Sequence, residues 1–162
     1  MDIAGKIIST DILLKRISFW RTMGDTIVFT NGCFDILHPG HIHLLRTCSE
    51  LGDRLIVGMN SDASVKRLKG IQRPINNEMH RSTMLAAITY TDAIVSFNED
   101  TPEQLIHVIK PDLLAKGGDW DTSKIVGGDF VKGYGGRVVS VNFLEGHSTT
   151  AIIEKTRGDN KN

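Results

Sequence analysis

Apolar residues along the chain follow two patterns, which predict strands that alternate with helices. Short apolar runs rich in β-branched residues, such as 54–60, predict buried strands. Runs in which apolar residues recur every three or four positions, such as 10–23, predict helices. The expected strands span 26–29, 54–60, 92–97, 112–116 and 137–143, and the expected helices span 10–23, 42–51, 61–68, 77–88, 101–110, part of 124–134, and 148–157. This alternation predicts an α/β domain with a parallel sheet of five strands.

Glycine and proline mark several of the expected helix boundaries. Gly24 and Gly52 follow two of the helical runs as stop signals. Thr101-Pro102-Glu103-Gln104 is typical of a capping box with proline at the first helical position. We therefore expect Thr101 to cap the helix at 101–110. Residues 159–162 follow the last expected helix, and we expect a loose, flexible tail there.

Length, charge and cysteine content restrict the class of protein. At 162 residues the chain suits one domain with a full hydrophobic core. Its 19 basic and 19 acidic side chains give zero formal net charge, which argues against a general nucleic-acid binder. No apolar run approaches the length of a membrane span, and the N-terminus lacks a signal-peptide pattern. Cys33 and Cys48 form no disulfide framework, so we expect a reduced, cytoplasmic protein.

The segment 30–41 carries the strongest candidate chemistry. It follows the first expected strand and leads into a helical run, so His38 and His41 fall in the first turn of a helix. Residues three apart share a helix face, which lets both histidines meet one anion. Pro39 suits that turn, because its missing N–H would have had no helical partner there.

The surroundings of these histidines favour a phosphate ligand. Gly32 and Gly40 leave room for a ligand to approach the backbone closely. The start of a helix also presents free N–H groups and a partial positive charge. Two simpler interpretations stay open: the histidines cap and pack a turn, or they bind zinc together with His43. The chain has no HExxH motif and no cysteine or carboxylate pattern that would complete a zinc site.

Two further segments follow expected strands and offer contacts to a ligand. Lys116-Gly117-Gly118-Asp119 is a flexible turn, or it lets a sugar or base lie against the backbone, with Asp119 accepting from ribose hydroxyls or helping to place a metal. Ser148-Thr149-Thr150 caps the last helix, or it forms a second anion site. In parallel sheets ligands bind beyond the carboxyl ends of the strands, where both segments fall.

Basic residues near these segments have a structural and a functional interpretation. Lys66 and Arg67 are typical of a solvated basic face, whereas Lys69 precedes Gly70 in a loop and can swing onto a phosphate. Arg81 is either an ordinary surface arginine or a phosphate ligand, because guanidinium presents a planar fork of donors to phosphate oxygens.

The segment 30–41 resembles the HxGH signature of the cytidylyltransferase-like nucleotidyltransferases, and Gly146-His147-Ser148-Thr149-Thr150 resembles their second signature. The resemblance covers most of the chain and implies a single Rossmann-like domain over residues 1–158, with helices on both faces of the sheet and the helix at 10–23 packed on it. It implies that His38 and His41 contact a nucleoside triphosphate and stabilise the transition state at its α-phosphate. The implied nucleotide-binding residues are Thr30, Asn31, Gly32, Cys33, Phe34, Asp35, Gly40, Arg81, Lys116, Gly118, Asp119, Gly146, Ser148, Thr149 and Thr150.

Four short motifs resemble one branch of that family, the D-glycero-β-D-manno-heptose 1-phosphate adenylyltransferases. They are Asn60-Ser61-Asp62, Arg73-Pro74-Ile75, Asp100-Thr101-Pro102 and Lys116-Gly117-Gly118-Asp119. This resemblance implies transfer of AMP from ATP to the sugar 1-phosphate, which gives ADP-heptose for lipopolysaccharide cores, and pyrophosphate. Lys69 and Asn60 would bind the substrate phosphate. His147 stands where an apolar or aromatic residue is expected.

The resemblance also implies a cofactor and partners. Mg²⁺ would bridge the triphosphate without direct protein ligands. A separate sugar kinase would supply the sugar 1-phosphate, and a homo-oligomer is expected. No nucleic acid or membrane partner is expected. Two alternatives remain: a cytidylyltransferase of the same fold that acts on glycerol 3-phosphate or a similar acceptor, and a non-catalytic nucleotide sensor.

Overall fold

A computed structural model of the protein describes residues 3–142 and 149–158. Its centre is a sheet of five parallel strands in the order β3-β2-β1-β4-β5. The predicted five-stranded parallel sheet is therefore confirmed. The strands are β1 (Ile27–Gly32), β2 (Arg54–Asn60), β3 (Ala93–Phe97), β4 (Leu113–Gly117) and β5 (Arg137–Val141).

Helices connect the strands close to the predicted positions. Ser9, Ser61 and Asn77 cap three of them, each accepting a hydrogen bond from a backbone N–H in the first turn. The helices are α1 (Thr10–Thr22), α2 (Pro39–Ser49), α3 (Asp62–Lys69), α4 (Glu78–Ala87), α5 (Glu103–Ile109), α6 (Gly128–Gly133) and α7 (Thr149–Gly158), with 3-10 turns η1 (Ala4–Lys6) and η2 (Thr122–Lys124). None of these helices in the described ranges combines the length and apolar content needed to span a bilayer.

The predicted capping box at α5 is wrong. The helix begins at Glu103, and Pro102 occupies the N-cap position with no side-chain capping hydrogen bond. The carbonyl of Pro102 accepts the first helical hydrogen bond, from the N–H of Ile106 at 2.9 Å. The N-cap position therefore lies one residue later than expected, at a residue whose side chain has no acceptor.

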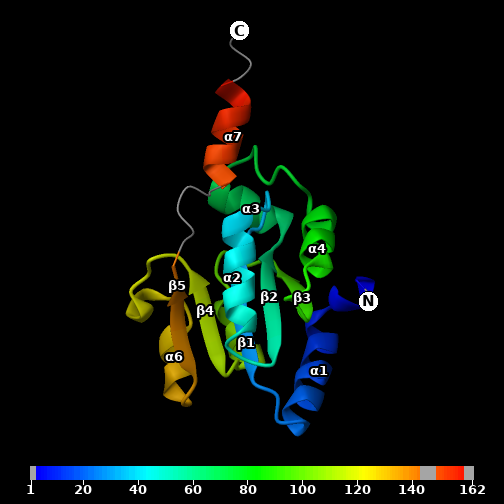
Figure 1. Ribbon diagram of the computed structural model, residues 1–162, viewed down its shortest axis with the longest axis vertical. Coiled ribbons are helices and arrows are strands. Elements are labelled where there is room, and N and C mark those ends of the chain that lie inside the picture. The colour runs from blue at the N-terminus through cyan, green and yellow to red at the C-terminus, as the bar shows by residue number, and fades with distance from the viewer. Residues whose placement is uncertain (1–2, 143–148, 159–162) are drawn as a thin grey trace.

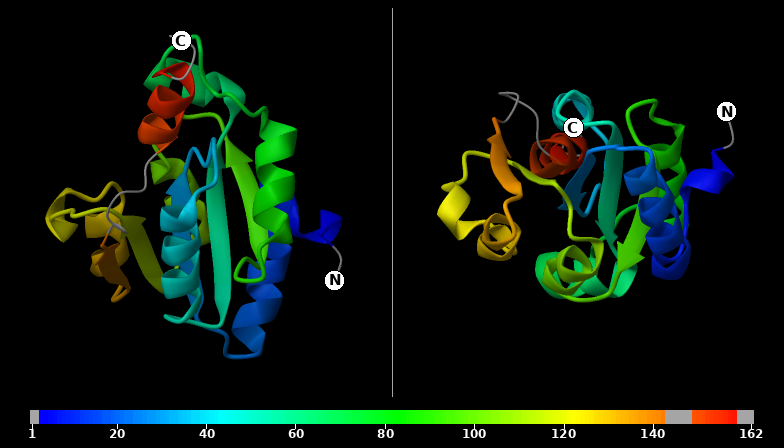
Figure 2. Two further views of the ribbon diagram at one scale, coloured as in Figure 1. Left: turned by 45° about the horizontal axis from the view of Figure 1, so that its top comes forward. Right: turned by 90° about the horizontal axis from the view of Figure 1, so that it is seen from below.

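Two apolar clusters bury the two faces of the sheet. Leu13 and Ile17 of α1, with Ile106 of α5, pack on one face, and Leu45 of α2 and Leu85 of α4 pack on the other. Burial of each such side chain contributes about 1.5–3 kcal/mol. Figure 2 (right) shows the sheet between these two sets of helices, so the prediction of helices on both faces is confirmed.

The strand order places a switch point between β1 and β4. From β1 the chain adds β2 and β3 on one side, and it adds β4 and β5 on the other. Thr30 pairs with Ala115, so Asn31 and Lys116 follow at neighbouring carboxyl ends. Ligands of open α/β sheets bind at such a point. In Figure 1, α7 lies beyond this edge of the sheet.

Candidate active site

The loop between β1 and α2 is a tight turn held by an aromatic side chain. Phe34 has a positive φ of 47° and is only 3% exposed. A Cβ on Gly32 would meet the Phe34 ring at 3.1 Å, so glycine permits this close packing. Pro39 lies at the start of α2, as predicted, and His38 is its N-cap residue.

This turn stacks the two histidines of the predicted signature. The ring centroids of His38 and His41 are 3.8 Å apart with an interplanar angle of 29°. The Phe34 ring packs against His41 with centroids 5.2 Å apart. The expectation that His38 and His41 lie together is therefore met, and Phe34 supports them from below.

Burial keeps His41 neutral. Burial, together with the smaller effect of the nearby His38, lowers the pKa of His41 to about 4. Nδ1 of His41 is buried and has no hydrogen-bond partner among the described residues. A neutral imidazole keeps one donor and one acceptor nitrogen. His41 therefore offers an unsatisfied polar atom at the bottom of a cleft.

Two clefts open above these residues at the carboxyl edge of the sheet. The larger has a volume of about 520 Å³ and the smaller about 200 Å³. His38 lines only the smaller cleft, whereas His41 lines both. The combined size suits small-molecule ligands. The residues shared by the two clefts are Asn31, Gly32, Phe34, His41, Lys116 and Thr149.

Lys116 is the positively charged residue among those shared by the two clefts, which together form their shared floor. Its Nζ donates a hydrogen bond to Oδ1 of Asn31 at 3.2 Å. Burial lowers the pKa of Lys116, and the nearby charge of Lys69 acts in the same direction. A phosphate in the cleft would relieve this crowding of positive charge. Lys69 lines the larger cleft, as expected for a phosphate ligand.

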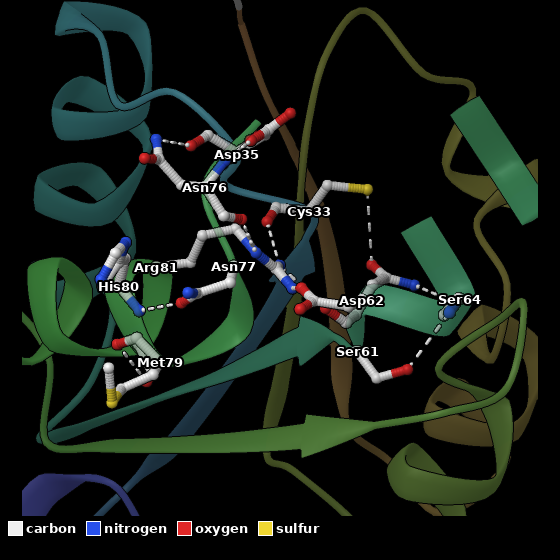
Figure 3. Close-up of polar contacts among 12 residues, drawn as sticks. Cys33, Asp35, Ser61, Asp62, Ser64, Asn76, Asn77, Met79, His80 and Arg81 are labelled. Atoms are coloured by element: carbon white, nitrogen blue, oxygen red, sulfur yellow. Dashed lines mark hydrogen bonds and ion pairs between the residues drawn. The ribbon is translucent and has the colours of Figure 1, made fainter. Parts of the chain in front are cut away.

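Arg81 has a different place from the one predicted. Its side chain is 0% exposed and lines neither cleft in the described part of the chain. Its guanidinium donates to the carbonyls of Cys33 at 2.6 Å and Asn60 at 2.8 Å, and to that of Asn76 at 3.1 Å. It also pairs with Asp62 at 2.8 Å. Figure 3 shows the guanidinium with Cys33, Asp62 and Asn76 around it.

This geometry corrects the assignment of Arg81 as a phosphate ligand. The arginine ties together the loop after β1, the end of β2, the start of α3 and the segment before α4. A buried charge requires such partners, because desolvation otherwise costs several kcal/mol. Sequence spacing could not show this, because Arg81 lies 48 residues from Cys33 and 21 from Asn60.

Asp35 also holds the loops, although it lies at the edge of the larger cleft. Its carboxylate accepts hydrogen bonds from the N–H groups of Ile75 at 2.8 Å and Asn76 at 2.9 Å, and it pairs with Arg73 at 2.5 Å. Burial alone would raise the pKa of Asp35, but these hydrogen bonds and the Arg73 charge lower it. The carboxylate is therefore committed to protein partners.

Asn60 and Cys33, two of the predicted ligand-binding residues, line the larger cleft. The Asn60 amide donates to Oγ of Ser64 at 3.0 Å, and its Oδ1 lies 3.8 Å from Sγ of Cys33. Burial raises the pKa of the Cys33 thiol, so it stays protonated at neutral pH. Cys33 thus acts as a small neutral residue of the loop.

Three other predicted nucleotide-binding residues do not line either cleft in the described ranges. Thr30 is fully buried on β1 beneath the site. The N–H of Gly118 donates to Val141 at 2.9 Å, and its carbonyl accepts from the Ser140 hydroxyl. Asp119 is exposed. Gly118 therefore joins the loop to β5, which a reading of local sequence could not reveal.

The second signature is described only in part. Thr149 begins α7 and lines both clefts, and its hydroxyl contacts the carbonyl of Ile36 at 3.4 Å. Gly146, His147 and Ser148 lie outside the described residues, as does the side chain of Thr150. Gly40 lines the smaller cleft, as predicted.

Sequence analysis assigned no role to several residues that line the larger cleft. The aromatic one is Trp120, which follows the glycine turn after β4. Arg73 and Asp100 belong to motifs that already resembled the adenylyltransferase branch, which was the available signal. The unassigned lining residues are Leu68, Arg73, Asp100, Thr101, Pro102, Trp120, Lys124, Ile125 and Val126.

The side chains around the two clefts do not favour a metal ion that is held by protein ligands alone. Among the described residues, no group of three or more His, Cys, Asp and Glu side chains could hold a metal ion. The carboxylates that line the larger cleft, Asp35 and Asp100, are paired with Arg73 and Arg67. A divalent cation would need oxygen ligands from a bound substrate and from water.

Comparisons with known proteins agree with this arrangement. A family model described as cytidylyltransferase-like matches residues 29–155. Bifunctional protein HldE of Marinomonas sp. (strain MWYL1) is 52% identical over 149 residues, which cover 92% of this chain and 31% of that protein. Bifunctional protein HldE of Pseudomonas aeruginosa (strain LESB58) is 51% identical over 151 residues, which cover 93% of this chain and 32% of that protein. The chain thus spans about a third of the length of these relatives.

Two solved structures are similar to this chain. The lipopolysaccharide core biosynthesis protein from Thermoplasma volcanium GSS1 has a TM-score of 0.61 at 28% identity, over 75% of this chain and 98% of that chain. Pantoate-beta-alanine ligase from Francisella tularensis has a TM-score of 0.58 over 93% of this chain and 76% of that chain. At 14% identity, the second likeness concerns the fold alone.

Proposed function

We propose that this chain, which belongs to the cytidylyltransferase-like family, transfers AMP from ATP to D-glycero-β-D-manno-heptose 1-phosphate. The products would be ADP-heptose and pyrophosphate. The relatives named HldE, about half identical to this chain over most of its length, support this choice of substrates.

The stacked pair His38 and His41 carries the proposal. The pair lies at the carboxyl end of β1, next to the switch point of the sheet, and at the junction of two clefts. A transferase must bring two substrates to one phosphorus atom, and this junction offers two approaches to one polar centre. Lys116 supplies positive charge at the same floor.

The reaction would be an in-line displacement. An anionic oxygen of the sugar phosphate forms a bond to the α-phosphorus of ATP, and the bond from that phosphorus to the bridging oxygen of pyrophosphate breaks. Because the nucleophile is already anionic, no strong general base is needed. Catalysis then rests on positioning and on stabilisation of charge. Each preorganised donor of this kind contributes about 2.7–4 kcal/mol.

The neutral state of His41 suits this role. Its low pKa keeps the ring neutral in the free protein, and a neutral ring can donate one N–H to a phosphate oxygen while lysines supply the positive charge. We propose that Mg²⁺, when bound together with ATP, would supply charge neutralisation for the leaving pyrophosphate, with no direct ligand from the described residues. A reaction that phosphorylates the sugar must supply the acceptor. A separate kinase, a homo-oligomer and a cytoplasmic location stay predictions.

Pyrophosphate release from a panel of substrates tests the proposal. ATP, CTP, GTP and UTP would each be combined with heptose 1-phosphate and with glycerol 3-phosphate. We expect release to be fastest with ATP and heptose 1-phosphate. A clear preference for CTP with glycerol 3-phosphate would instead favour a cytidylyltransferase. Nucleotide binding without release from any pair would favour a sensor.

A further inference from the structure

The larger cleft has a rim of exposed residues, of which only Lys69 has so far been considered as a ligand. On one side of this rim lie Trp120 and Lys124, from the segment between β4 and α6. On the other side lie Lys69, at the end of α3, and Asp100, from the segment between β3 and α5. An aromatic ring and two lysines therefore face one space, next to the shared floor.

Trp120 is fixed in place although much of it is exposed. Its indole N–H donates to the carbonyl of Gly117 at 3.1 Å, and its backbone N–H donates to Oγ of Ser140 at 3.1 Å. The Ser140 hydroxyl in turn donates to the carbonyl of Gly118. The side chain is still 48% exposed. A large apolar ring held at two points is preorganised. Little side-chain conformational entropy is therefore lost when a ligand packs on it.

The cations at this rim are available to a ligand. Lys69 and Lys124 form no ion pair with any residue in 3–142 or 149–158. Asp100, by contrast, is paired with Arg67 at 2.7 Å. The rim thus combines one fixed aromatic surface with two unpaired positive charges. These features suit a ligand that has an apolar ring face next to a negatively charged group.

We propose that this rim is the acceptor subsite, in which the sugar ring lies against Trp120 and its phosphate is held by Lys69 and Lys124. In a sugar 1-phosphate the phosphate is bonded to the ring itself. The C–H groups on one face of that ring suit the negative face of an indole. In ATP, by contrast, the ribose separates the base from every phosphate. An aromatic ring next to lysines therefore fits the sugar phosphate better than the nucleotide.

The arrangement of the two clefts agrees with this division. The smaller cleft runs from the shared floor toward β5, along Val141 and Asn142. The larger cleft instead reaches Lys69 and Trp120, neither of which lines the smaller one. In-line displacement needs the acceptor and the leaving group on opposite sides of the α-phosphorus. The acceptor would thus occupy the larger cleft while the nucleoside occupies the smaller one. The proposal rests on the proposed transferase function.

Steady-state kinetics of two Trp120 variants test the subsite. Trp120→Ala should raise KM for heptose 1-phosphate roughly 5–10-fold, the scale of a lost aromatic contact, and leave KM for ATP within about 2-fold. Trp120→Phe keeps a ring but loses the indole hydrogen bond to Gly117, so its KM for heptose 1-phosphate should lie between those of the native protein and Trp120→Ala. If KM for the sugar phosphate is unchanged in Trp120→Ala, the subsite is overturned while the transferase function stands. If only KM for ATP rises, the indole serves the base and the subsite is also overturned.

Fluorescence provides a test that does not need turnover. The chain has two tryptophans, Trp20 and Trp120, and Trp20 is only 8% exposed on α1. In a Trp20→Phe variant, titration with heptose 1-phosphate should change the emission of Trp120 with saturation. The matched Trp120→Phe variant, which keeps Trp20, should show no change. Equal responses of the two variants would overturn the proposal, even if pyrophosphate release from the native protein establishes the transferase function.

Discussion

Two polar clusters lie side by side around the loop after β1, and they differ in how far their polar atoms are satisfied. Around Arg81, three backbone carbonyls and the Asp62 carboxylate accept hydrogen bonds from the guanidinium, and the carboxylate balances its charge. Around His41, a buried ring nitrogen has no hydrogen-bond partner among the described residues, and burial lowers the pKa. Both clusters contain residue types that suit phosphate binding.

The difference separates residues that build a site from residues that act in it. A buried polar group costs free energy unless it is paired, so a fully paired one is a structural element. A buried group without a partner requires an explanation, and a ligand provides one. Arg81 therefore sets the position of the loop, whereas His41 is the residue that we propose meets the substrate. Four predictions test this contrast, from the largest expected effect to the smallest.

The largest effect should come from Arg81. Arg81→Met keeps most of the volume but leaves one buried and two partly buried carbonyls, and the Asp62 carboxylate, without this donor, so the free energy of unfolding should fall by about 3–5 kcal/mol. Urea unfolding measures this loss. Arg67→Met, which breaks the exposed pair with Asp100, is the matched control and should cost under about 1 kcal/mol. A stable Arg81→Met protein with weakened phosphate binding would restore the original assignment.

The second effect concerns turnover. His41→Ala and His38→Ala should each lower kcat by roughly 10²–10³, because each removes a preorganised donor at the reacting phosphate. Unfolding free energy should change much less than in Arg81→Met. His43→Ala, at an exposed position on the same helix, should keep native kcat. Near-native turnover in either of the first two variants would contradict the proposed mechanism.

The third effect concerns binding. Lys69→Ala should raise KM for the phosphorylated substrates by roughly 10–100-fold, because a charge-assisted hydrogen bond contributes about 1.5–3 kcal/mol. Lys66→Ala changes an exposed lysine on the same helix that lines neither cleft, and it serves as the control. Equal, small changes in both variants would place Lys69 on a solvated face.

The smallest effect is a pH dependence from a single group. The pKa of His41 is about 4 in the folded protein, below its ordinary value of 6.5. Between these values the unfolded chain binds more protons, so this contribution to stability is complete above pH 6.5 and is lost as pH falls toward 4. The unfolding free energy of the native protein should fall more steeply across this window than that of His41→Gln. Parallel curves would show that His41 is not desolvated.

Much of the fold and the centre of the site could be predicted from the sequence. Strands and helices have periods of two and 3.6 residues, and these periods appear in the order of apolar residues. The strand that ends near Gly32, the helix that begins at Pro39 and the pairing of His38 with His41 are all local features of one segment. Their spacing along the chain fixes how they lie relative to one another, so the sequence pattern predicts their positions in the structure.

Tertiary structure decided which other residues reach the ligand. Thr30 and Gly118 belong to the expected segments, yet core packing and a bond to β5 hold them away from the clefts. Arg81 was indistinguishable from a surface arginine until partners 48 and 21 residues away enclosed it. The role that we propose for Trp120 depends on the strand order, because this order lets its segment line one cleft together with Lys69. Contacts between distant segments depend on strand order and on burial, and neither has a local period that a sequence pattern can show.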